Sequence, residues 1–336
     1  MDVNGVISIF NIDENIVYIK RDKIIYKGKE INIRVDCDFG TNFTNNKIFL
    51  NAVDGSIYYV NLEKDILVKA NGFSKNMKFP LNEQYFYEPL YDGNLLLKFY
   101  DFNNKLIQEW TNPNSWRAIP FNSIIIILSE ENDLISIYQF LENKIIWTYS
   151  IKELGIYTDF TGTYGGKFLL PFIECQGVII SEITSPGLIS SNVRFIGLDV
   201  ANGDLLWINE FPNPYRPKII NYKNELLVLG EFYNKYDPHT GNLLGPNLPF
   251  KDTIGEYQSL LVTDEYIFSA TLMIDIKQYS RKNGEILWTY SLHNGKKKGK
   301  GINSINKDNP MQYAESKLYV LDIGNVLHVL DVPNDI

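Results

Sequence analysis

Short apolar runs alternate with polar turns along the whole chain. Segments such as Asn224–Asp237, Glu265–Ser280 and Ser316–Asp331 each hold two apolar runs of strand length, separated by polar or glycine residues. Such runs, bounded by turn residues, are typical of strands in a packed sheet. The same pattern offers no amphipathic helix of ordinary length. It therefore predicts an all-β protein.

One hairpin signature recurs in these segments. In its best copy, Gly197–Trp207 (GLDVANGDLLW), Asp199 stands four residues before Gly203 and eight before Trp207. Other copies keep part of this set: Gly284 with Trp288, Asp237 with Gly241 (and Gly245 in the Trp position), and Trp147. Copies follow one another at about 40 residues, apart from a step of 60 between Gln139 and Asp199 and one of 51 between Ser280 and Asp331. A period of about 40 residues with β-hairpins is typical of propeller blades.

Each position of the signature has a physical reason. Glycine adopts the positive φ that a tight hairpin requires. Aspartate accepts hydrogen bonds from the backbone amides of the turn. Tryptophan on the outgoing strand has enough area to fill the seam between neighbouring blades. We therefore interpret the repeated residues as structural.

These observations predict a single β-propeller domain over residues 1–336, built of four-stranded blades. Seven blades are favoured, and a further hairpin at Asn15–Gly28 keeps eight as the alternative. The chain ends in the incoming strand Asn325–Val332, and Asn4–Phe10 resembles its missing outgoing partner. Pairing of these N- and C-terminal strands would close the ring and cover the sheet edges. Loop insertions are expected near 151–166, 174–191 and 292–312, and the insertion at 174–191 would explain the long step.

The signature resembles the tryptophan-docking motif A-x-D-x-x-x-G-x-x-x-W of the PQQ-like (quinoprotein alcohol dehydrogenase-like) β-propeller family. Gly197, Asp199, Gly203 and Trp207 match it, with glycine in place of alanine. Enzymes of that family carry adjacent cysteines, a calcium or lanthanide site with a catalytic aspartate, and an export signal. Here Cys37 and Cys175 are isolated, and no position receives the catalytic residues. The resemblance therefore implies a non-enzymatic member without a cofactor.

Charge and hydropathy restrict the partners and the compartment. The formal net charge of −8 argues against a nucleic-acid partner, which selects for a basic surface. The N-terminal residues lack the pattern of a signal peptide, and no apolar run approaches the ~18 residues of a membrane span. We expect a cytoplasmic protein without membrane insertion, whose two cysteines are buried, reduced thiols.

Residues with catalytic chemistry are scattered. His239, His293 and His328 lie in different repeats, and no zinc, phosphate-binding or nucleophile motif occurs. The acidic stretch Ser129–Leu134 and the lysine-rich stretch His293–Gly301 are interpreted as solvated loops. We therefore predict no catalytic, cofactor-binding or metal-binding residues, and no enzyme.

Irregular segments between blades emerge on one face of a propeller and are the expected binding surface. They contain aromatic and arginine side chains of the types enriched at interface hot spots. These candidate partner-binding residues are Trp116, Arg117, Tyr157, Phe160, Tyr164, Tyr215 and Arg216. Covering the ends of the core is the alternative role for each of these rings.

The combined prediction is an intracellular protein-binding scaffold without catalysis, with an inhibitor or immunity-type partner as a subtype. The alternative is an enzyme or a binder of a small ligand, such as a glycan or nucleotide, in the central channel. A quinoprotein oxidoreductase is the remote third class.

Overall fold

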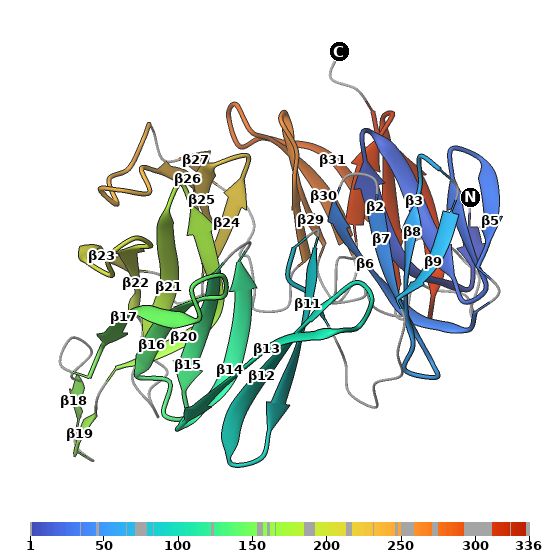
Figure 1. Cartoon of the computed structure of the whole chain (residues 1–336). Coiled ribbons are helices and arrows are strands. Elements are labelled where there is room, and N and C mark those ends of the chain that lie inside the picture. The colour runs from blue at the N-terminus through green and yellow to red at the C-terminus, as the bar shows by residue number, and fades with distance from the viewer. Residues whose placement is uncertain are drawn as a thin grey trace. The chain divides into compact units, whose positions relative to one another are not determined.

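In the computed structural model, the chain consists of β-strands joined by turns (Figure 1). The structure describes residues 2–33, 35–44, 47–64, 66–70, 79–82, 84–121, 124–152, 157–159, 162–164, 166–184, 192–212, 217–230, 232–245, 248–249, 259–270, 275–291, 311–322 and 324–333. No helix in these ranges is long and apolar enough to cross a membrane. Contacts divide the chain into two compact units, of residues 1–88, 99–107 and 257–336, and of residues 89–98 and 108–256.

Four antiparallel sheets belong to the first unit. Two follow one another at the start of the chain: β2 (Val6–Ile12), β3 (Asn15–Lys20), β4 (Lys23–Tyr26), β5 (Lys29–Asn32), and β6 (Cys37–Thr44), β7 (Lys47–Ala52), β8 (Ile57–Asn61), β9 (Ile66–Ala70). Two lie at its end: β28 (Ser259–Val262), β29 (Tyr266–Ala270), β30 (Asp275–Ser280), β31 (Ile286–Ser291), and β32 (Met311–Ala314), β33 (Lys317–Leu321), β34 (Val326–Asp331), β1 (Asp2–Asn4).

Three sheets belong to the second unit: β14 (Ser115–Phe121), β15 (Ile124–Ser129), β16 (Leu134–Gln139), β17 (Lys144–Ser150); β20 (Lys167–Cys175), β21 (Val178–Thr184), β22 (Asn192–Asp199), β23 (Leu205–Pro212); and β24 (Lys218–Tyr222), β25 (Glu225–Leu229), β26 (Phe232–Tyr236), β27 (Leu248–Pro249). A further sheet has residues in both units: β10 (Phe79–Pro80), β11 (Tyr85–Tyr91), β12 (Asn94–Asp101), β13 (Leu106–Pro113). The hairpin β18 (Tyr157–Asp159) and β19 (Gly162–Tyr164) stands between β17 and β20.

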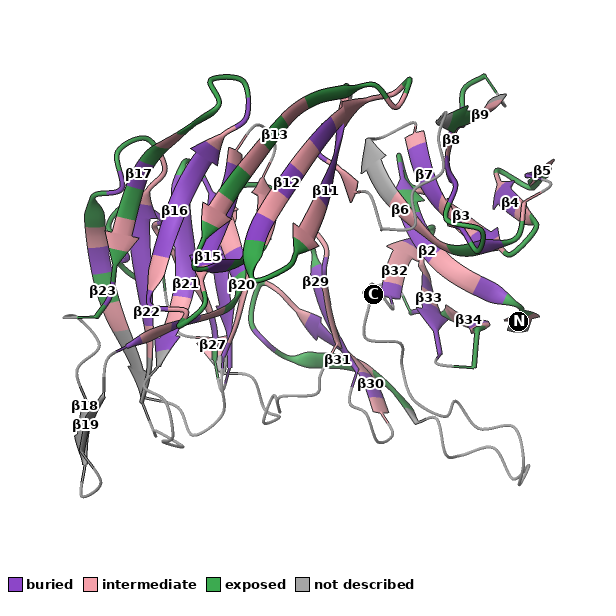
Figure 2. Ribbon diagram, turned by 60° about the horizontal axis from the view of Figure 1, so that its bottom comes forward, coloured by how far each residue is buried: buried purple, intermediate pink, exposed green. Residues whose placement is uncertain are grey.

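Burial follows the position of a strand in its sheet. The middle strands β15 and β16 are buried over four consecutive residues each, so both of their faces are covered. The outer strands β13 and β17 carry mostly exposed or half-buried residues, as the colours of Figure 2 show. Consecutive burial on both faces is expected for a sheet packed between two others. The apolar runs in the sequence are these middle strands.

The described residues form eight four-stranded sheets, so the favoured count of seven was wrong and the alternative of eight holds. The additional sheet is β2–β5, which contains the hairpin Asn15–Gly28. Its last turn, at Lys27 and Gly28, has positive φ angles of 50° and 73°. No tryptophan follows that turn, so the repeat signature did not mark the sheet.

The two ends of the chain share one sheet, as the sequence predicted. Strand β1 pairs antiparallel with β34, with Asp2 opposite His328 and Asn4 opposite Val326. The expected segment was wrong: the paired strand is Asp2–Asn4, whereas most of Asn4–Phe10 belongs to β2 of another sheet. Gly5 takes a positive φ of 75° and ends β1, and Val6 begins β2 in the neighbouring sheet.

The long step between repeats has a different cause from the one expected. Residues 174–184 are not an insertion, because they belong to the paired strands β20 and β21 and their turn at Gln176 and Gly177. The additional length lies in the link from β17 to β20, which holds the β18–β19 hairpin, and in the link from β21 to β22. Residues 185–191, in that second link, and most of the 292–312 segment lie outside the described residues.

Candidate functional site

The repeated aspartates and glycines shape the turns between the third and fourth strands of the sheets. The Asp199 Oδ1 atom accepts the N–H of Ala201 at 2.7 Å, and the Gly203 N–H donates to the Asp199 carbonyl at 2.9 Å. Asp237 repeats this geometry with the N–H groups of Thr240 and His239, which hold the pKa of its carboxyl below the usual value. Gly284 donates to the Ser280 carbonyl in a third copy, at 2.9 Å.

The tryptophans bind these turns from the preceding sheet. Trp147 of β17 donates its indole N–H to the Val200 carbonyl at 2.7 Å, and its ring lies where a Cβ on Gly203 would come within 2.6 Å. Trp207 of β23 does the same with the Pro238 carbonyl, at 2.7 Å, and with Gly241. Each indole therefore holds two neighbouring sheets together, which is a structural role.

Two further tryptophans complete this description. Trp110 of β13 packs on Tyr138, with ring centroids 4.6 Å apart. The sequence indicates only a weak copy of the signature here, because Trp110 stands nine residues, not eight, after its aspartate, Asp101. Trp288 of β31 packs against a buried cluster that includes Met311, Leu318 and Val320 of the next sheet.

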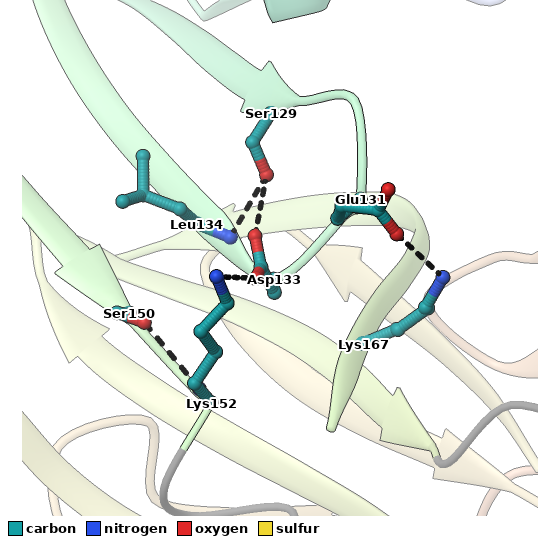
Figure 3. A network of polar contacts seen from close by, with 7 residues as sticks. All are labelled: Ser129, Glu131, Asp133, Leu134, Ser150, Lys152 and Lys167. Atoms are coloured by element: carbon teal, nitrogen blue, oxygen red, sulfur yellow. Dashed lines mark hydrogen bonds and ion pairs between the residues drawn. The ribbon is translucent and has the colours of Figure 1, made fainter. Parts of the chain in front are cut away.

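The turn between β15 and β16 carries a cluster of hydrogen-bonded polar side chains (Figure 3). This turn lies at the opposite end of β16 from the β16–β17 turn. Asp133 is 7% exposed and accepts hydrogen bonds from the Ser129 hydroxyl at 2.9 Å and from the Lys152 ammonium at 3.0 Å. Burial alone would raise the pKa of Asp133, but the bonds from Lys152 and Ser129 outweigh it, and the pKa is lowered. The stretch Ser129–Leu134 is therefore a turn fixed by the side-chain bonds of Asp133, and not the solvated loop that we expected.

The same turn fixes both ends of the link that carries the β18–β19 hairpin. The N–H of Ile151 donates to the Asp133 carbonyl at 2.9 Å, and that of Phe168 to the Asn132 carbonyl at 2.7 Å. The Lys167 ammonium lies 3.4 Å from a Glu131 carboxylate oxygen (Figure 3). In the hairpin, the backbones of Tyr157 and Tyr164 pair directly. Both ends of the link that carries the β18–β19 hairpin are therefore bonded to the β15–β16 turn.

Trp116 is the extra residue of a β-bulge beside this turn. Ser115 pairs with Ser129 and Arg117 with Leu128, so Trp116 has no partner across the ladder. A bulge redirects the side chain of its extra residue. The indole N–H of Trp116 donates to the Asn132 Oδ1 atom at 2.8 Å, and the side chain is 37% exposed. The Arg117 guanidinium lies over the ring, 5.4 Å from its centroid.

Tyr91 reaches the same turn from β11. Its hydroxyl donates to a Glu130 carboxylate oxygen at 2.6 Å, and this bond raises the pKa of the tyrosine. The residue is 55% exposed. Two exposed aromatic side chains, Tyr91 and Trp116, are thus fastened by their polar atoms to one rigid turn. Tyr91 was not predicted from the sequence, because it lies outside the irregular segments that supplied the candidate residues.

The remaining candidates are placed as follows. Phe160, Tyr215 and Arg216 lie outside the described residues, as do the side chains of Tyr157 and Tyr164. Among the described residues, no group of three or more His, Cys, Asp and Glu side chains could hold a metal ion. His328 pairs with Asp322, with 3.1 Å between Nε2 and Oδ2.

Comparison with known proteins identifies the fold. No family model and no curated protein sequence matches the chain. Among solved structures, the computationally designed protein Ika8 is similar at a TM-score of 0.60 and 12% identity, over 98% of this chain and 96% of that one. The fold is a β-propeller.

Two natural β-propellers are similar at the same level. BamB from Moraxella catarrhalis has a TM-score of 0.54 and 10% identity, and 98% of each chain is covered. Sqt1 from Saccharomyces cerevisiae has a TM-score of 0.57 and 10% identity, over 98% of this chain and 96% of its own. In all, 1332 solved chains match, so the propeller is too widespread to indicate a function by itself.

Proposed function

We propose that this β-propeller is a non-catalytic scaffold that binds another protein, and that the binding surface is centred on Tyr91, Trp116, Arg117 and Glu130. We call these four residues the Trp116 surface. The observation that carries the proposal is the bulge at Trp116, which leaves an indole exposed while its only polar atom is already bonded to Asn132. A ring whose N–H is satisfied offers its apolar face to a partner at little further polar cost.

Rigidity supports the same proposal. The β15–β16 turn is bonded to β11, β14 and β20 through Tyr91, Trp116 and Lys167 respectively, and to Lys152, two residues after the end of β17. Fixed aromatic and arginine side chains lose little conformational entropy on binding and dominate interface energies. Binding residues usually stand on loops held by a rigid scaffold. The Trp116 surface has each of these properties.

We also propose the finer assignment that the sequence suggested. The Asp–Gly–Trp docking geometry of Asp199, Gly203 and Trp207 supports a non-enzymatic member of the PQQ-like group. The net charge of −8 supports a basic partner, such as an enzyme or toxin that the propeller inhibits. The cytoplasmic location stays a prediction of the sequence.

Affinity capture with a matched control tests the binding role. Wild type, a Tyr91→Ala/Trp116→Ala double variant and a Leu141→Ala variant would be immobilised and exposed to lysate of the native source. Leu141 is 69% exposed in the β16–β17 turn, at the opposite end of β16 from the Trp116 surface. We expect a stoichiometric protein partner on wild type and on Leu141→Ala, and its loss from the double variant.

Two outcomes would contradict the proposal. Equal capture by all three proteins would place the binding surface elsewhere, and equal loss from both variants would indicate a general effect on folding. Melting temperatures of the three proteins, measured in parallel, separate loss of the surface from loss of the fold. If no protein is captured, a small-ligand screen becomes the next test of the alternative function.

A further inference from the structure

Charges around the β15–β16 turn are paired with two exceptions. Lys152 binds Asp133 at 3.0 Å, and Lys167 lies 3.4 Å from Glu131. The Arg117 guanidinium is exposed and, within the described ranges, has neither an ion pair nor a hydrogen bond. It lies over the Trp116 ring, which orients the guanidinium without neutralising it.

Glu130 is the second charged residue at this turn that has no ion-pairing partner among the described residues. Its Oε1 atom accepts the Tyr91 hydroxyl, a neutral donor, and no described cation lies within ion-pairing distance of it. Its backbone N–H donates to the Asn114 carbonyl at 3.1 Å, so the position of the residue is fixed. The Trp116 surface therefore presents one cation and one anion without an ion-pairing partner among the described residues, each in contact with the side chain of an exposed aromatic residue.

This pattern is complementary to itself. In a two-fold symmetric dimer, both copies use the same surface. If one residue of the first copy contacts another residue of the second copy, the same contact also occurs with the two copies exchanged. Arg117 of each copy then faces Glu130 of the other, and the four aromatic side chains lie between the two ion pairs. Arginine and carboxylate match in planar, bidentate geometry. Arg117 pairs with Leu128 of β15, two residues before Glu130, so both charges lie on the same small area.

We propose that a second copy of this chain docks on the Trp116 surface and forms a two-fold dimer through reciprocal Arg117–Glu130 pairs. Burial of Trp116 and Tyr91 stabilises the dimer, because aromatic rings contribute most where they are fully desolvated. The charge pairs set the register and select the partner. Self-association is independent of the proposed function, although a different protein that binds the same surface would compete with it.

Sedimentation velocity tests the dimer with the protein itself. Wild type should change from monomer to dimer as its concentration rises to about 200 μM, the range that reveals micromolar dissociation constants. Arg117→Glu gives a surface with two anions, and Glu130→Arg gives a surface with two cations. Each single variant should dimerise at least about 10-fold more weakly than wild type, because like charges would face each other.

Mixing the variants gives the decisive result. Arg117→Glu and Glu130→Arg in equal amounts should form a heterodimer, and the Arg117→Glu/Glu130→Arg double variant should dimerise again. Lys282→Glu, an exposed charge reversal in the β30–β31 turn, is the matched control and should behave as wild type.

The failure of this proposal can be told apart from that of the proposed function. A wild type that stays monomeric at about 200 μM would refute the dimer and leave the capture experiment unaffected. Single variants that dimerise as wild type does, or a mixture that shows no heterodimer, would place the contact on another face. Heterodimer formation in the mixture, with retained melting temperatures, would establish both the surface and the charge pairing.

Discussion

Removal of the Trp207 side chain should cost much of the stability of the second unit. The residue is 9% exposed, its N–H is bonded to the Pro238 carbonyl at 2.7 Å, and its ring covers Gly241. Truncation of a buried aromatic side chain to alanine costs about 3–5 kcal/mol. Trp207→Phe keeps most of the ring packing but leaves the Pro238 carbonyl without a donor, so we expect about 1–2 kcal/mol.

Urea unfolding followed by far-ultraviolet circular dichroism measures both values, because that signal arises mainly from the backbone and persists when the tryptophan is replaced. The control is Ile208→Ala on the same strand, where the side chain is 37% exposed and the cost should stay below about 1 kcal/mol. Trp207→Ala within about 1 kcal/mol of wild type would refute the reasoning, since the indole could then not join the two sheets.

Three further predictions concern buried polar groups. Gln278 is fully buried, and its side-chain amide has no hydrogen-bond partner in the described part of the chain. Gln278→Met should therefore raise the free energy of unfolding by about 1 kcal/mol. A lower melting temperature of the variant would contradict this. Burial raises the pKa of Cys37 to about 12 and that of Cys175 to about 11. Neither thiol should therefore react with Ellman's reagent at mildly alkaline pH until urea unfolds the protein. Rapid reaction of the native protein would show that a thiol is accessible. The lowered pKa of Asp133 stabilises the fold above the ordinary carboxyl pKa of about 3.9, and this contribution is lost as the pH falls through the lowered value. Asp133→Asn should therefore melt below wild type at neutral pH and converge with it in acid, whereas a constant difference would assign the effect to packing.

The sequence predicted the propeller because the turn chemistry repeats. Asp199 and Gly203 mark a turn, and Trp207 marks the side chain that binds the following turn; both follow from local properties. The count of blades failed at β2–β5, where Gly28 supplies the turn without a tryptophan. That sheet is held by aliphatic packing, such as that of Ile19 and Ile24, which leaves no distinctive spacing.

The candidate site was predictable only in part. Trp116 and Arg117 were found because the sequence around them predicts an irregular link with residue types common at interfaces, although both in fact stand in β14, at its bulge. The importance of Asp133 could not be seen, because its partner Lys152 stands 19 residues later and reaches it only through the sheet. The spacing of Ser129 and Asp133 around a short turn was the one local signal available.

The pairing of β1 with β34 has a consequence for how the protein is made. Asn4 leaves the ribosome first, and its neighbour Val326 follows about 320 residues later. At about 5–20 residues per second, synthesis separates the two by on the order of 15 to 65 s. Throughout that time the first strand has no edge to join, so the sheet of β32, β33, β34 and β1 can assemble only after Val326 to His328 have been synthesised. Variants that slow this step should accumulate as nascent or newly released chains that engage chaperones, even where the finished protein is as stable as wild type.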